Sequence, residues 1–112
     1  MKISKKTSNH YKWGNNCDGW HLLASEGLSV IEENMPVSAE EKLHYHNKAQ
    51  QFFYILKGEA TFYIEHEKIV ISQNEGIHIS PQRPHKIANY GNEPLQFLVI
   101  SQPRSHGDRV DL

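Results

Sequence analysis

Short apolar runs, each ended by turn residues, follow one another along most of the chain, and no long stretch repeats with the period of a helix. The run Phe52–Leu56 stops at Lys57 and Gly58, and Ala60–Ile64 follows at once, a pattern typical of a β-hairpin. Short strands at a spacing of roughly 8–12 residues are typical of sandwiches and barrels. The sequence therefore predicts an all-β fold.

We expect strands over Gly19–Ala24, Leu28–Ile31, Leu43–His46, Phe52–Leu56, Ala60–Ile64, Ile69–Ile71, Ile77–Ile79, Lys86–Ala88 and Leu95–Ile100. The second of these runs on toward Met35. A short helix over Ala39–Lys42 is a weaker alternative, because no capping residue supports it. The first dozen residues and the tail from Pro103 are expected to be extensions that pack on the surface or on a partner.

Size and charge limit the classes of protein to consider. The chain of 112 residues is long enough for one domain, residues 1–112, with its own core. A net charge of -1 with scattered basic residues argues against a nucleic-acid partner. No apolar run approaches the ~20 residues of a membrane helix, and none follows the basic N-terminus as in a signal peptide. The lone Cys17 leaves no internal disulfide, so we expect a buried or inert thiol in a cytoplasmic protein.

Histidine is the outlier of the composition, with eight residues. His44 and His46 lie in one expected strand, so their side chains share a face, with Cα atoms ~7 Å apart. Two imidazoles at this spacing can meet one metal ion at distances of ~2.0–2.1 Å. Among eight histidines, however, a pair spaced in this way arises by chance about half the time. The pair alone is equally well explained by two partly exposed histidines on an edge strand.

The surrounding residues carry a resemblance to a known family. From His44 the chain reads HYHNKAQQFFYILKG, and further on it reads NEGIHISPQRPHKIAN. These segments resemble the two motifs of the cupin superfamily, and the matching residues are His44, His46, Gly58, His85 and Asn89. The resemblance covers about residues 35–101. It implies a single-domain jelly-roll β-barrel with one divalent metal ion on His44, His46 and His85, and with Gln51 as the fourth ligand.

The sequence departs from the motifs at three glycine positions, which hold Ser38, Asn74 and Gln82. Asparagine tolerates the left-handed backbone that glycine supplies, so Asn74 suits a turn. Gln82 suits one less well, although the fixed φ angles of Pro81 and Pro84 could set the loop before His85.

Gln51 stands where the motif has glutamate, and this change alters the charge of the expected metal site. Strand alternation places only one of Gln50 and Gln51 on the inward face, and the register of the motif selects Gln51. A carboxylate with three neutral imidazoles would leave a divalent ion with a net charge of about +1, whereas an amide leaves about +2. We therefore expect weaker metal retention and a stronger attraction for anionic ligands. Three nitrogens and one oxygen suit Zn, Ni, Fe or Mn, and affinity should fall below about pH 6.5 as the imidazoles take up protons.

Three histidines leave coordination positions open, as in catalytic sites. The first hypothesis is a metal-dependent enzyme of the dioxygenase or isomerase type that acts on a small oxygenated molecule. The second is a non-enzymatic module that binds or senses a metal and a small ligand, and the third is a metal-free cupin whose histidines bind the ligand directly. No second acid or base stands out. Phe53 is the best candidate for a pocket wall, and Phe97 is a weaker one. The other five histidines are expected to have no role in the site. The resemblance to cupins also implies a homodimer.

Overall fold

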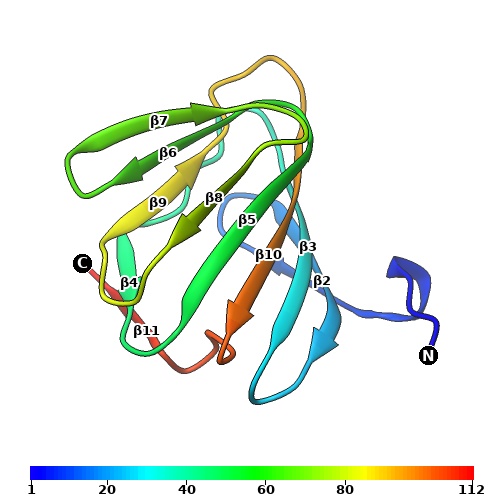
Figure 1. Ribbon diagram of the computed structural model, residues 1–112. Helices are drawn as coiled ribbons and strands as arrows, with labels where there is room; N and C mark the ends of the chain where they lie inside the picture. Colours follow the sequence, from blue (N-terminus) through cyan, green and yellow to red (C-terminus); the bar gives the residue numbers. More distant parts are fainter.

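Two antiparallel sheets that face each other make up the fold, in a computed structural model that describes residues 1–112 (Figure 1). One sheet has six strands in the order β1-β2-β3-β10-β5-β8, and the other has five in the order β11-β4-β9-β6-β7. The elements are η1 (Lys5–Thr7), β1 (Asn9–Trp13), β2 (Cys17–Ala24), β3 (Ser29–Met35), β4 (His44–His46), β5 (Gln50–Lys57), β6 (Ala60–Ile64), β7 (Glu67–Ile71), β8 (Gly76–Ile79), β9 (His85–Ala88), β10 (Leu95–Gln102) and β11 (Arg109–Asp111). The prediction of an all-β jelly roll is confirmed.

The core lies between the sheets because inward and outward residues alternate along each strand. In β5 the buried positions are Gln51, Phe53 and Ile55, and in the neighbouring β10 they include Phe97 and Val99. Their apolar side chains join one cluster with residues of the facing sheet, among them Phe62, Ile64 and Ile87. Burying this cluster provides the main free energy that holds the two sheets together.

The two ends of the chain differ from the expectation, because each adds an edge strand. β1 pairs with β2, and β11 pairs with β4. Neither segment has a strong strand pattern: β1 reads NHYKW, without a buried residue, and β11 reads RVD. The alternative helix over Ala39–Lys42 does not form, because Glu40 makes a β-bridge with Ala88 instead.

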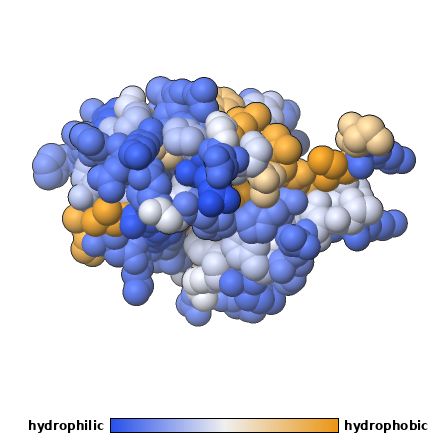
Figure 2. All heavy atoms as spheres, turned by 90° about the horizontal axis from the view of Figure 1, so that it is seen from below, coloured by the Kyte–Doolittle hydropathy of each residue, from blue (hydrophilic) through white to orange (hydrophobic).

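The segment before β1 projects from the body of the molecule, and Figure 2 shows hydrophobic atoms on it. Met1 and Ile3 are exposed there. The structure contains no helix with the length and apolarity that crossing a bilayer requires.

The three positions that lack the motif's glycine keep a left-handed backbone. Ser38, Asn74 and Gln82 have φ angles of 74°, 67° and 66°. At Gln82 a hydrogen bond helps to hold this conformation, because its backbone N–H donates to the carbonyl of His46 at 2.7 Å. The loop before His85 thus retains its turn without glycine, and it is tied directly to β4.

Asn89 closes β9 with a completely buried side chain. Its amide nitrogen donates to the carbonyls of Met35 and Glu93 at 3.0 and 2.9 Å, and its amide oxygen accepts from Gly91 N–H at 3.0 Å. One side chain therefore joins the end of β3 to the loop that leads into β10.

Replacement of this amide should destabilise the protein. We expect Asn89→Ala to lower the free energy of unfolding by roughly 3 kcal/mol, because buried carbonyl and N–H groups lose their partners. The exposed Asn92→Ala, in the same loop, is the control and should change it by less than ~0.5 kcal/mol. Urea unfolding followed by tryptophan fluorescence measures both, and equal effects would contradict this role for Asn89.

Candidate metal centre

The four predicted site residues come from both sheets and meet in the interior. β4 supplies His44 and His46, and β9 supplies His85, which lies directly opposite His44 in the strand register. Gln51 reaches in from β5 of the facing sheet. Ligand atoms of the three histidines lie within 4.8 Å of one another, and all four residues are at most 5% exposed.

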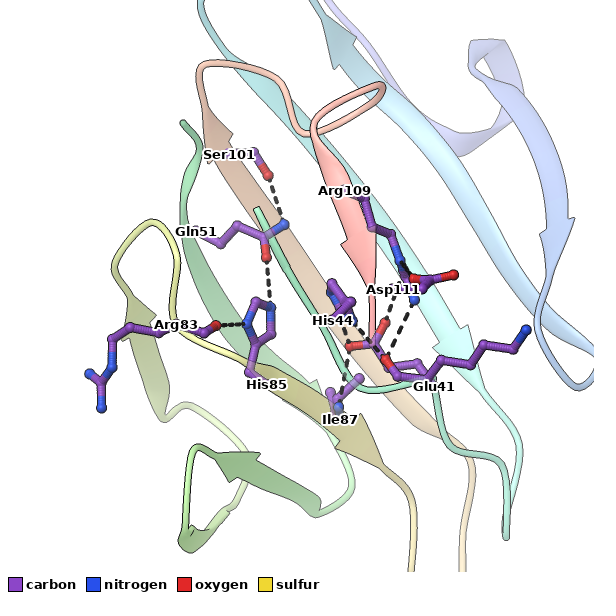
Figure 3. Close-up of polar contacts among 10 residues, drawn as sticks. Glu41, His44, Gln51, Arg83, His85, Ile87, Ser101, Arg109 and Asp111 are labelled. Carbon is purple, nitrogen blue, oxygen red and sulfur yellow. Dashed lines mark hydrogen bonds and ion pairs between the residues drawn. The ribbon is translucent and has the colours of Figure 1, made fainter. Parts of the chain in front are cut away.

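Backbone carbonyls orient two of the imidazoles (Figure 3). Nδ1 of His44 donates to the carbonyl of Lys42 at 2.7 Å, and Nδ1 of His85 donates to the carbonyl of Arg83 at 2.8 Å. A neutral imidazole has only one N–H group, so Nε2 of each ring carries a free lone pair. Carbonyl partners of this kind set the tautomer and the ring orientation of metal-ligating histidines.

Burial keeps the three rings neutral. It lowers the pKa of His44 to about 3 and that of His46 to about 4, and it also lowers the pKa of His85. From the sequence alone, protons were expected to compete with the metal ion for the imidazole nitrogens just below pH 6.5. In the fold the imidazoles stay in their metal-binding form to lower pH.

The contact between Gln51 and His85 identifies the place where a cation fits. Oε1 of Gln51 lies 3.2 Å from Nε2 of His85, while Nε2 of Gln51 donates to Oγ of Ser101 at 3.1 Å (Figure 3). With Nδ1 of His85 protonated, both atoms of the first contact present lone pairs and neither brings a proton. A positive ion beside them satisfies both lone pairs at once.

His46 is the third imidazole of the site. Unlike those of His44 and His85, its Nδ1 is buried without a hydrogen-bond partner. Buried polar atoms without partners are uncommon and often mark a ligand site. Three neutral imidazoles and an amide oxygen match the donors that divalent transition metals accept. The residues present therefore fit such an ion.

A cavity of roughly 310 Å³ adjoins the site. His44, His46 and Gln51 form part of its lining, and Phe53 and Phe97 are among its apolar walls, as the sequence indicated. This volume is at the low end of the range for small-molecule sites.

The cavity also has polar residues that the sequence analysis missed: Tyr11, Glu33, Glu41, His106 and Arg109. Glu33 could have been found, because it alternates with the buried Ile31 and Met35 along β3 and so takes an inward position. The others lie near the chain ends or in the connection before β4, where no periodic pattern points to the cavity.

Arg109 and Glu41 form the charged part of the lining (Figure 3). Arg109 lies 3.8 Å from the Glu41 carboxylate, and its Nε donates to Asp111 at 2.6 Å. Burial raises the pKa of Glu41 to about 7, although Arg109 opposes the shift. Glu41 approaches Nε2 of His44 to 3.9 Å, but it does not join the group whose ligand atoms converge.

The remaining expected residues lie outside the metal centre. His66 and His78 are exposed, and His78 forms a hydrogen bond with Gln50. His21 and His106 have ring centroids 5.2 Å apart, beside Tyr11. Cys17 is completely buried, and burial raises the pKa of its thiol to about 11, which agrees with an inert thiol.

Acid should destabilise the metal-free protein. His44 and His46 take up protons near pH 6.5 in the unfolded chain, but only near pH 3 and pH 4 in the fold. Between these pH values the unfolded state binds more protons than the folded state. The free energy of unfolding therefore falls as the pH drops from 6.5 toward 4, by up to about 1.4 kcal/mol per pH unit for each histidine. Urea unfolding in chelator at a series of pH values measures this. His46→Asn should reduce the slope and the exposed His66→Asn should not; a flat profile in the wild type would contradict the argument.

Comparison with known proteins agrees with the fold. Over 81 residues the chain is 38% identical to an uncharacterized protein of Methanocaldococcus jannaschii, covering 71% of this chain and 65% of that protein. The chain thus spans just under two thirds of that relative. It is also 27% identical, over 85 residues, to an oxalate-binding protein of Thermotoga maritima, covering 71% of this chain and 70% of that protein.

Among solved structures, a predicted oxalate decarboxylase from Thermotoga maritima superposes with a TM-score of 0.85 at 21% identity, over 93% of this chain and all of the other. At this identity the likeness shows the fold alone. The family model described as Cupin domain matches residues 31–101, which include both histidine motifs. The chain belongs to the cupin family.

Proposed function

We propose that this protein holds one divalent transition-metal ion on His44, His46, His85 and Gln51, and that it binds or acts on a small anionic oxygen compound in the adjoining cavity. The observation that carries the proposal is the contact between Gln51 Oε1 and His85 Nε2, in which two lone pairs face each other at 3.2 Å beside two further neutral imidazoles. When bound, the ion would supply Lewis-acid polarisation of an oxygen ligand.

The charge of the site favours an anion. All four proposed ligands are neutral, so they would leave the charge of a divalent ion uncompensated. Arg109 adds a positive charge to the lining, although Glu41 and Asp111 are its ion-pair partners. A compact anionic ligand suits a cavity of roughly 310 Å³ with apolar walls. The similarity to an oxalate-binding protein supports the same class of ligand.

The leading form of this proposal is an enzyme of the dioxygenase or isomerase type. The second form is a binding or sensing module without turnover, which the amide at position 51 favours because it should hold the metal less tightly. Oxygen uptake and product analysis with oxalate, diketones, phenols and sugars on metal-loaded protein separate the two. Turnover of any of them supports the enzyme, and ligand binding without turnover supports the module. The homodimer and the cytoplasmic location stay predictions.

Replacing the amide by a carboxylate should strengthen metal binding. We expect Gln51→Glu to slow the loss of metal to a mild chelator at least tenfold, because a carboxylate adds a negative charge beside the ion. Elemental analysis during dialysis of protein without a polyhistidine tag measures the loss. The matched control is Gln50→Glu, which adds the same charge one position away on the outward face of β5. Equal retention by wild type and Gln51→Glu would contradict the proposed ligand set.

Anion binding should depend on the metal. Oxalate should bind the metal-loaded protein at least ten times more tightly than the metal-free protein, measured by calorimetry. His46→Ala should abolish the difference, whereas the exposed His78→Ala should preserve it. Equal affinity with and without metal would instead support a metal-free cupin whose histidines bind the ligand directly.

A further inference from the structure

Tyr11 and Glu33 line the cavity from the six-stranded sheet, whereas His44 and His46 line it from the five-stranded sheet. Glu33 takes an inward position of β3, between the buried Ile31 and Met35. Neither the Glu33 carboxyl nor the Tyr11 hydroxyl forms a hydrogen bond or ion pair with another residue, in contrast to Glu41, which has three partners at 3.2–3.9 Å. Glu33 and Tyr11 are therefore free to bind a ligand.

A glycine allows Tyr11 to take this position. Tyr11 lies on the edge strand β1, and Gly19 of β2 separates it from Glu33 of β3, since Gly19 pairs with both residues in the sheet register. The Tyr11 ring lies directly over Gly19: a Cβ atom there would be 2.4 Å from Cζ of Tyr11 and 2.6 Å from its hydroxyl oxygen. Any side chain at position 19 would displace the ring, so Gly19 lets a tyrosine from the sheet edge reach across β2.

The surroundings favour the protonated, hydrogen-donating form of both groups. Burial, and then the Glu41 carboxylate, raise the pKa of Glu33 well above its ordinary value, and Arg109 opposes this shift more weakly. Burial, and then Glu33, raise the pKa of Tyr11. The Cys17 thiol, on β2, also feels the charge of Glu33 and is neutral at pH 7, and His44, His46 and His106 are the other titratable residues of the cavity lining. A carboxylic acid and a phenol in these states both donate hydrogen bonds to an anion.

We propose that Glu33 and Tyr11 form a donor pair that binds the oxygen-bearing end of a ligand whose other end lies at the metal centre. This inference rests on the proposed function and narrows its ligand class to short compounds with an oxygen group at each end, such as dicarboxylates and keto or hydroxy acids. The cavity also has apolar walls, among them Ile31, Phe97 and Val99, which suit the carbon skeleton of such a compound.

The test compares two probes, malonate with two carboxylates and acetate with one, by calorimetry on the metal-loaded full chain at pH 7. We expect Glu33→Ala to weaken malonate at least tenfold and acetate less than threefold. Glu33→Gln keeps a donor of the same shape and should stay within threefold of wild type for both probes. Tyr11→Phe should weaken malonate by three- to tenfold. Glu32→Gln, an outward-facing neighbour on β3, is the matched control and should change neither affinity.

The pH dependence gives a second measurement that a purely structural role of Glu33 would not produce. Malonate affinity of wild type should fall as the pH is raised through the range in which Glu33 ionises, because the ionised carboxylate repels the anion. Glu33→Gln should lose this part of the pH dependence. Equal losses of affinity for acetate and malonate in Glu33→Ala, or tighter malonate binding in that variant, would overturn the donor pair.

If neither probe binds metal-loaded wild type, the proposed function fails and the donor pair fails with it. If both bind and Glu33 variants do not distinguish them, only the donor pair fails. Urea midpoints within the range of the Glu32→Gln control confirm that the variants are folded.

Discussion

The direct opposition of His44 and His85 on neighbouring strands is the contact on which the site depends. β4 has only three residues and pairs with β9 at this single position, which brings the two ring centroids to 4.4 Å. A slip by one residue would turn the imidazoles out of the interior, since side chains alternate between the faces of a strand. The loop before β9 limits such a slip, because Gln82 N–H is bonded to the His46 carbonyl. Asn89 anchors the other end of β9 to β3.

The inner part of the site could be predicted from the sequence because its information is local. Alternation along a strand puts His44 and His46 on one face, and the spacing of two short motifs adds His85 and Gln51. Glu33 follows from the same alternation, once β3 is extended to Met35. The three turn positions without glycine also kept their geometry, which shows that a left-handed turn in this fold tolerates serine, asparagine and glutamine.

The outer part could not be predicted, because long-range contacts position it. β11 has three residues and one apolar side chain, so local propensity does not specify a strand. Its place depends on Asp108, whose carboxylate accepts hydrogen bonds from the backbone N–H groups of Lys48 and Ala49, residues about sixty positions earlier in the chain. β1 likewise joins the sheet edge through its pairing with β2, although its own burial pattern is weak. Tyr11 and Arg109 reach the cavity only as a result of these two pairings.

The amide of Gln51 explains how one site can suit both a metal-bound and a metal-free protein. With Oε1 toward His85, as in the structure, two lone pairs face each other, and a cation beside them would stabilise this arrangement. If the amide turns over, its N–H group donates to the lone pair of His85 and the Ser101 hydroxyl donates to the amide oxygen, so every group is satisfied without metal. A glutamate at this position would need a proton on itself or on His85 to make the metal-free contact, and burial disfavours the charged imidazole. Glutamine therefore allows every buried polar group of this contact to be satisfied in the metal-free barrel, which glutamate would allow only with an added proton.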